Sequence, residues 1–161
     1  MASPSGLWTP EPFQTGDGLI PFERFVNDLS DFKYMALHAA IDRVLSVRGI
    51  DLVRTEWLKP LGGGLHEFRV RHDADEVVHM FGGSPPQAAA PAGKVMLRVF
   101  VHFYGHKTIL LLGGYDKGED PTESRQRREI AEARRLLAQF RERRRRQRGQ
   151  VSRPKKGRRR T

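Results

Sequence analysis

The uneven distribution of charge along this chain limits which part of it can build a core. Of its 29 Lys and Arg residues, 17 lie from Glu123 to the end, with only 4 of the 19 Asp and Glu residues. That segment carries a net charge of +13, whereas residues 1–122 carry −3 and are nearly neutral. A like-charge block of this density repels itself and commonly docks on a polyanion. The last helix still has an apolar stripe at helical spacing, Ile130, Ala133, Leu137 and Phe140, and we expect it to pack on the sheet through this stripe while its arginines stay exposed.

Composition narrows the class of protein further. A length of 161 residues predicts one domain, and the absence of cysteine excludes disulfides, thiolate metal sites and a cysteine nucleophile. No stretch reaches the roughly 18 apolar residues of a membrane-spanning helix. Residues 1–17 lack the basic start and apolar run of a secretory signal. These features together favour a cytoplasmic protein with no membrane partner.

Two helices are predicted after a short N-terminal arm. Residues 1–20 are rich in Pro, Gly, Ser and Thr and predict an extended arm. Pro21 can open a helix, and Ser30 or Asp31 can cap a second one that ends at Gly49. The apolar faces of the two helices repeat at helical spacing. They consist of Phe22, Phe25, Val26 and Leu29, and then of Leu37, Ile41, Val44 and Leu45.

Three strands are predicted in the middle of the chain. Residues 65–71 alternate imperfectly between apolar and polar side chains, which favours a strand with a polar face. Residues 95–104 and 108–112 form a second and a third strand, joined by a turn that contains His106. Residues 113–118 form a loop or a short edge strand. Asp73 and Glu76 have the spacing of a capping box and predict a short helix between the first two strands.

The predicted order is helix, helix, strand, short helix, strand, strand, helix, which is an α+β fold. The last helix starts at Asp120-Pro121-Thr122-Glu123, where an acid, a proline and a second acid occupy the cap and first turn. We expect one domain over residues 21–142, interrupted by a low-complexity loop at 83–94. Residues 143–161 are almost all Arg, Lys, Gln and Gly, and we expect this tail to be disordered.

The common catalytic motifs are absent. The chain contains no Walker loop, no dinucleotide-binding glycine pattern, no zinc-protease helix motif and no nucleophile elbow. The run Gly62-Gly63-Gly64 reads as a flexible lead into the first strand, and the six histidines lack zinc spacing. We therefore expect no metal and no cofactor.

What remains is a set of polar groups on the predicted sheet. Arg69 lies on the first strand and Arg98 on the second, and Tyr115 and Lys117 follow the third. Cleavage of RNA through its 2′-hydroxyl needs cations for the phosphorane charge and groups that remove and donate a proton. These four residues are the catalytic candidates. Solvated side chains or, for Arg98, a structural salt bridge would explain the same pattern.

Other basic residues are candidates for holding RNA without reacting with it. They are Arg71, Lys107, Arg127 and Arg128.

The order of several segments resembles the RelE/ParE toxin superfamily, in its HigB-like, phage-derived branch. Leu65-His66-Glu67-Phe68-Arg69-Val70 resembles the first-strand pattern of that branch, and Leu97-Arg98-Val99-Phe100 resembles the second. Ile109 to Gly118 and Arg127 to Arg134 are similar to the end of its sheet and its last helix. Trp57-Leu58-Lys59-Pro60-Leu61 fits the lead-in, so the resemblance covers roughly residues 22–142.

This resemblance implies two N-terminal helices packed on a small, mostly antiparallel sheet. It also implies the toxin of a type II toxin–antitoxin system, which cleaves mRNA on the ribosome without a metal and is neutralised by a cognate antitoxin. In the family the arginine of the second strand, here Arg98, helps to hold the scissile phosphate. Arg69 matches the basic residue of the first strand, and Tyr115, Asp116 and Lys117 match more variable polar positions.

The sequence leaves two other functions open. A ParE-like toxin has the same fold and inhibits DNA gyrase by binding it, so fold alone does not decide the activity. A non-enzymatic protein could instead bind RNA or DNA through its basic tail. The chain departs from the smallest relatives in its longer segment 73–94 and in that tail.

Overall fold

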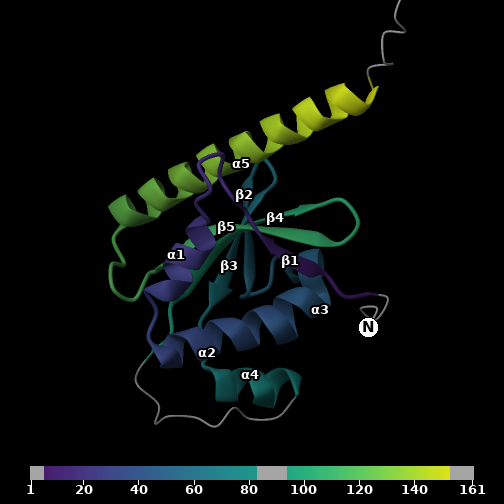
Figure 1. Ribbon diagram of the computed structural model, residues 1–161. Coiled ribbons are helices and arrows are strands. Elements are labelled where there is room, and N and C mark those ends of the chain that lie inside the picture. The colour runs from purple at the N-terminus through teal and green to yellow at the C-terminus, as the bar shows by residue number, and fades with distance from the viewer. Residues whose placement is uncertain (1–5, 83–93, 153–161) are drawn as a thin grey trace, which may run out of the picture.

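The computed structural model describes residues 6–82 and 94–152, and of residues 151 and 152 only the backbone. The fold is a five-stranded sheet with helices on both faces (Figure 1). The order of strands is β1-β5-β4-β3-β2, in which β1 pairs with β5 in parallel and the other neighbouring strands pair antiparallel. The expected α+β class and the mostly antiparallel sheet are confirmed.

The central strands are those that the sequence predicts. They are β3 (Leu65–Val70), β4 (Leu97–Tyr104) and β5 (Thr108–Asp116). Strand β5 runs on through residues 113–116 and pairs with β4 over its whole length, so the expectation of a separate loop or edge strand there is wrong. This extension sets Tyr115 directly opposite Arg98.

Two outer strands were not expected. Strand β1 (Thr9–Pro12) lies in the segment that predicts a loose arm, and β2 (Leu58–Gly62) lies in the connection before the first predicted strand. The described part of the chain therefore begins with a strand, so a fold that opens with two helices is not confirmed. Helices at Pro21–Asn27 and Asp31–Ala40 do lie where the sequence predicts them. Gly62, Gly63 and Gly64 all have positive φ and form the turn from β2 to β3, a conformation that glycine adopts without strain.

The first group of helices packs on one face of the sheet. It comprises α1 (Pro21–Asn27), α2 (Asp31–Ala40), a π-helical turn (Ile41–Leu45), α3 (Ser46–Arg48), a 3₁₀ turn (Gly49–Leu52) and α4 (Ala74–Phe81). The side chain of Ser30 caps α2, and the predicted capping box of Asp73 and Glu76 caps α4. Their core includes Leu37, Val44, Phe68, Val99 and Leu111.

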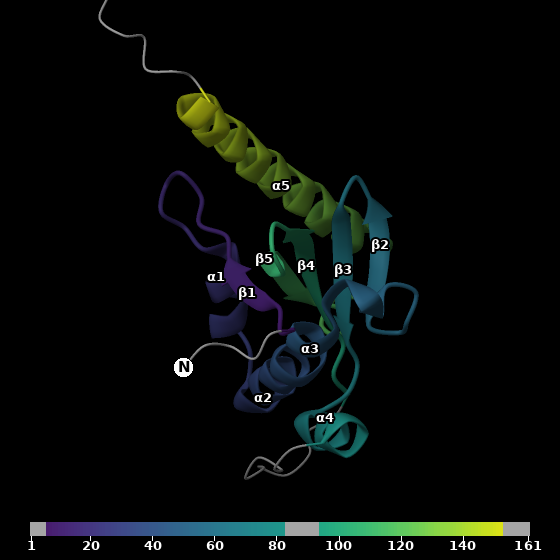
Figure 2. The ribbon, with the colours of Figure 1, turned by 90° about the vertical axis from the view of Figure 1, so that its right-hand side faces the viewer.

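Helix α5 (Glu123–Ser152) covers the opposite face alone, as the two views show (Figures 1 and 2). We call this the α5 face. Its separate core contains Phe13, Leu65, Phe100, Leu110, Leu112, Tyr115, Ala133, Leu136, Leu137 and Phe140. Burial of Phe13, 2% exposed, shows that the N-terminal segment is part of the fold. Side chains alternate between the two faces along each strand, so every second residue of a strand lies on the α5 face. Polar residues at those positions on neighbouring strands therefore lie close together.

Helix α5 is longer than the sequence predicts. Residues 143–152 continue the helix, so the expectation of disorder from residue 143 is wrong for them. Residues 153–161 of the tail, and residues 83–93 of the low-complexity loop, lie outside the described residues. Arg134 donates to the carbonyls of Leu61 and Gly62, and Arg141 donates to that of Gly63. These bonds tie the helix to the β2–β3 turn.

Candidate functional site

The four catalytic candidates lie together at one end of the α5 face. In the sheet register Arg69 of β3 faces Arg98 of β4, and Arg98 faces Tyr115 of β5. Lys117 comes directly after β5 and its backbone N–H donates to the carbonyl of Met96, which keeps it beside the start of β4. Three strands that are distant in sequence thus bring one set of polar groups to one place.

Glu67 is at the centre of this set, although sequence reasoning did not single it out. Its Oε1 lies 2.9 Å from Nε of Arg69 and 3.6 Å from Nε of Arg98. Glu67 and Arg69 differ by two residues on one strand and therefore share a face. That spacing, an acid two positions after apolar Leu65 and two positions before a cation, is the signal that could have identified it. We call Glu67, Arg69, Arg98, Tyr115 and Lys117 the Arg–Glu cluster.

The cluster is unusually buried for charged groups. Glu67 is 0% exposed and Arg98 is 2% exposed, and they are the only buried charged residues in the described part of the chain. Arg98 also donates to the carbonyl of Leu97 at 3.2 Å. Burial lowers the pKa of the Arg98 guanidinium, and the negative charge of Glu67 opposes that shift. A buried charge persists only with a partner, and Glu67 is that partner.

Three buried polar atoms of the cluster have no hydrogen-bond partner among the described residues. They are Oε2 of Glu67, Nε of Arg98 and the hydroxyl of Tyr115. Each such atom costs about 1–3 kcal/mol of folding free energy, and native proteins contain few of them. Their concentration in one cluster favours a functional role over a purely structural one.

The side chains at the rim of the cluster are those that solvent reaches. The side chain of Arg69 is 22% exposed, Lys117 is half-buried, and Arg71 is exposed. Desolvation by burial lowers the pKa of Lys117, and the positive charge of Arg98 lowers it further. Lys117 therefore gives up its proton more readily than an ordinary lysine does.

Tyr115 lies beneath this rim. Burial raises the pKa of its phenol, and the charge of Glu67 adds to the effect, so the hydroxyl keeps its proton. The guanidinium of Arg125, at the start of α5, lies 5.5 Å from the centre of the Tyr115 ring and covers it. The sequence around Arg125 does not indicate that this residue contacts Tyr115 of β5, so it could not be singled out from sequence.

The four RNA-binding candidates do not lie together. Arg71 is close enough to lower the pKa of Arg98 by its charge. Arg127 and Arg128 are exposed on the first turns of α5. Lys107 is separated from the others, because it lies in the β4–β5 turn at the opposite end of the sheet, where its Nζ donates to the carbonyl of Gly6. The hairpin geometry thus removes Lys107 from any site built on Arg98.

Neither a metal site nor a membrane helix is found among the described residues. Over residues 6–82 and 94–152, no group of three or more His, Asp or Glu side chains is placed to hold a metal ion. None of the described helices is long and apolar enough to cross a membrane. Comparisons with family models, curated proteins and solved structures find no match to this chain.

Proposed function

We propose that this chain is a toxin that cleaves mRNA on the ribosome by attack of a 2′-hydroxyl, without a metal, and that a cognate antitoxin neutralises it. The observation that carries the proposal is the Arg–Glu cluster. It combines cations, a proton-bearing phenol and a lysine of lowered pKa on one sheet face, with a buried carboxylate that holds two of the cations.

The chemistry assigns a role to each exposed group. The 2′-oxygen attacks the adjacent phosphorus while the bond from phosphorus to the 5′-oxygen breaks. The products are a 2′,3′-cyclic phosphate and a 5′-hydroxyl, and one proton passes from the 2′-oxygen to the 5′-oxygen by way of protein groups. Arg69 and Arg71 would neutralise the phosphorane, and Lys117 would exchange the proton.

Arg98 has a different role in this proposal. At 2% exposure it cannot reach a phosphate without rearrangement, so we assign it to positioning. It holds Oε1 of Glu67, which in turn orients the guanidinium of Arg69 at 2.9 Å. The same reasoning makes Tyr115 a supporting residue, because it is also 2% exposed. The family resemblance implies that Arg98 contacts the phosphate. In this proposal Arg98 instead acts indirectly, by holding Glu67, which orients Arg69.

The test is to express the chain from a tightly repressed promoter and to map the 5′ ends of cellular mRNA with a method that captures 5′-hydroxyl termini. Lys117→Gln removes the proton-exchanging group at the rim, where the fold should tolerate it. Arg24→Gln is the matched control, because it removes one exposed cation from helix α1, away from the cluster in the sequence. New cuts in translated messages are expected with the wild type and with Arg24→Gln, and a loss of at least about 100-fold with Lys117→Gln.

Other outcomes would refute the proposal. Equal cutting by the wild type and by Lys117→Gln would show that the cluster takes no part in the cleavage. Growth arrest without new 5′ ends, together with arrested DNA supercoiling, would favour inhibition of gyrase instead. Neither arrest nor cutting would leave a basic protein that binds nucleic acid and does not cleave it.

A further inference from the structure

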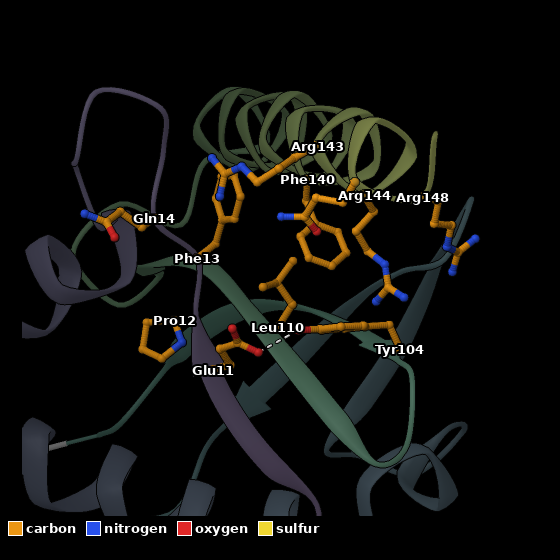
Figure 3. Close-up of a pocket in the computed structure, with 11 residues that line it drawn as sticks. Glu11, Pro12, Phe13, Gln14, Tyr104, Leu110, Phe140, Arg143, Arg144 and Arg148 are labelled. Carbon is orange, nitrogen blue, oxygen red and sulfur yellow. Dashed lines mark hydrogen bonds between the residues drawn. The ribbon is translucent and has the colours of Figure 1, made fainter. Parts of the chain in front are cut away.

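A second feature of the α5 face lies at the end opposite the Arg–Glu cluster. There the C-terminal half of α5, the end of β1 with the residues after it, and the β4–β5 hairpin line a cleft of about 800 Å³ (Figure 3). A neighbouring hollow of about 420 Å³ lies against the same helix, and Tyr104, Phe140, Arg144 and Arg148 line both. We call Phe13, Tyr104, Phe140, Arg143 and Arg144 the basic cleft.

Aromatic rings form the inner surface of the basic cleft. Phe140 of α5 packs edge-on against Tyr104, with ring centres 4.8 Å apart, and against Phe13 at 6.2 Å. His102 stacks parallel to Tyr104 with its ring centre 6.2 Å away. The rings come from three separate elements, so the tertiary fold assembles them. Flat rings beside a cationic surface are the usual means by which proteins hold unpaired bases.

Guanidinium groups of helix α5 pack on these rings. Arg144 lies 4.7 Å from the centre of the Tyr104 ring, and Arg143 lies 5.0 Å from that of Phe13 (Figure 3). Within the part of the chain that the structure describes, neither forms an ion pair with a carboxylate. Stacking on a ring holds a guanidinium in place and leaves its in-plane N–H groups able to bind phosphate oxygens.

Charge also favours an anionic occupant. Among the described residues, the only acidic side chain that lines the cleft is Glu11, and its carboxylate already accepts a hydrogen bond of 2.6 Å from the hydroxyl of Tyr104. The nearby pair of Arg145 and Arg146 is partly neutralised by Glu142, whereas Arg143 and Arg144 keep their full charge. The cleft therefore presents uncompensated cations next to rings.

The basic cleft is too far from the Arg–Glu cluster to be part of it. Arg125 covers Tyr115 in the cluster and Arg144 covers Tyr104 in the cleft. These two arginines lie 19 positions apart on α5, which corresponds to about 28 Å along a straight helix. A single nucleotide cannot touch both sites.

We infer that the basic cleft binds an unpaired strand of RNA, with bases against the rings and phosphates on Arg143 and Arg144. Binding of an unpaired strand follows from the cleft itself. The choice of RNA over DNA rests on the proposed function. The cleft would act as a second contact that anchors RNA at a distance from the cluster, whether or not the cluster cleaves it.

The test measures binding of a fluorescein-labelled RNA 12-mer without secondary structure to the full chain, by anisotropy between roughly 50 and 200 mM KCl. Arg143→Gln with Arg144→Gln should weaken binding at least about tenfold and lower the slope of log K against log salt by about 1.4, as two lost phosphate contacts require. Arg135→Gln with Arg146→Gln is the matched control. It removes two cations that pair with Glu132 and Glu142 on the same helix, and it should change affinity less than about threefold.

A second pair of variants tests the rings. Tyr104→Leu removes the ring and should weaken binding about tenfold, whereas Tyr104→Phe keeps the ring and should bind like the wild type. An Arg24→Gln chain, which loses one exposed cation outside the cleft, should also bind like the wild type. The experiments distinguish failure of the proposed function from failure of this inference. If only the proposed function fails, the wild type does not cut mRNA but still binds RNA in the cleft. Far-UV circular dichroism checks that each variant folds.

Three results would overturn the inference. Equal weakening by the cleft pair and by the control pair would show that only total charge matters. Displacement of the RNA by poly-glutamate as effectively as by unlabelled RNA would make the occupant an acidic peptide. Tighter binding of a DNA 12-mer of the same sequence would overturn the choice of RNA.

Discussion

Tyrosine and arginine meet at both ends of the α5 face, but their surroundings differ. At one end Arg98 and Tyr115 are each 2% exposed, and Arg98 pairs with Glu67, which is fully buried. At the other end Arg144 stacks on the ring of Tyr104 beside an open cleft, and no carboxylate of the described chain pairs with it. Arginine next to tyrosine thus occurs in two settings. At one end the arginine belongs to a buried ion pair, and at the other it belongs to an open cationic surface.

The difference follows from desolvation. A cation inside the sheet layer has lost its water and needs a carboxylate partner, whereas one at the rim keeps its water and needs only a surface to pack on. The Arg–Glu cluster should therefore dominate stability, and the basic cleft should tolerate substitution. Substitutions at the two ends of the α5 face should differ accordingly in their effect on the free energy of unfolding.

Glu67→Ala should destabilise the fold most. It leaves Arg98 buried without its carboxylate, and we expect the free energy of unfolding to fall by about 3–5 kcal/mol in urea denaturation. Glu142→Ala is the matched control, because Glu142 also pairs with two arginines, Arg145 and Arg146, but on the surface. That change should cost less than about 1 kcal/mol. Equal effects of the two substitutions would contradict the contrast.

Replacing both members of the buried pair should undo much of the damage. Glu67→Leu combined with Arg98→Met removes both charges and fills similar volumes, so no uncompensated charge remains. We expect the double variant to be at least about 2 kcal/mol more stable than Glu67→Leu alone. Losses that simply add across the two single variants would show that the residues do not interact. The repacked variant also lacks the group that holds Arg69, so mRNA cutting should not return with stability.

The cluster could be predicted from sequence because it depends on a local rule. Alternation along a strand puts Arg69 on one face, and a hairpin of known length sets Tyr115 near Arg98. Glu67 obeys the same rule but was overlooked, since cations alone were counted as phosphate ligands. Lys107 is the opposite case. Its charge made it a candidate for RNA binding, but the β4–β5 hairpin places it at the end of the sheet opposite Arg98.

The basic cleft could not be predicted, because it depends on contacts between distant segments. Strand β1 contains two prolines, which disfavour a strand in isolation, and it pairs with β5 about a hundred residues later. The last turns of α5 look too charged to stay helical. Glu142 pairs with Arg145 and Arg146 at helical spacing, and Arg144 packs on Tyr104, which together favour the helix.

Tyr104 offers a smaller effect that depends on pH. Burial, then the hydrogen bond to Glu11, raise the pKa of its phenol to about 12. Its stabilising effect is therefore complete below the ordinary value of 10.0 and is lost as the pH rises through about 12. Tyr104→Phe should cost about 1 kcal/mol at neutral pH, and the difference from wild type should vanish at the alkaline end of this range. Paired unfolding curves would check this, and a difference that persists at high pH would refute the role of the bond.

The smallest effect is expected on the opposite side of the sheet, at His72. Burial acts to lower the pKa of His72, but hydrogen bonds to Glu76 and Glu56 outweigh it and raise the pKa above 6.5. The protonated histidine thus stabilises the fold below pH 6.5, and the effect fades as the pH rises through the raised value. Both carboxylates are about half exposed, so we expect less than about 1 kcal/mol. Unfolding of wild type and His72→Gln between pH 5 and 8, a window set on either side of the ordinary histidine pKa of about 6.5, should show a gap that closes with rising pH. A larger effect here than at Glu67 would mean that burial does not set the energetic weight of charge pairs in this fold.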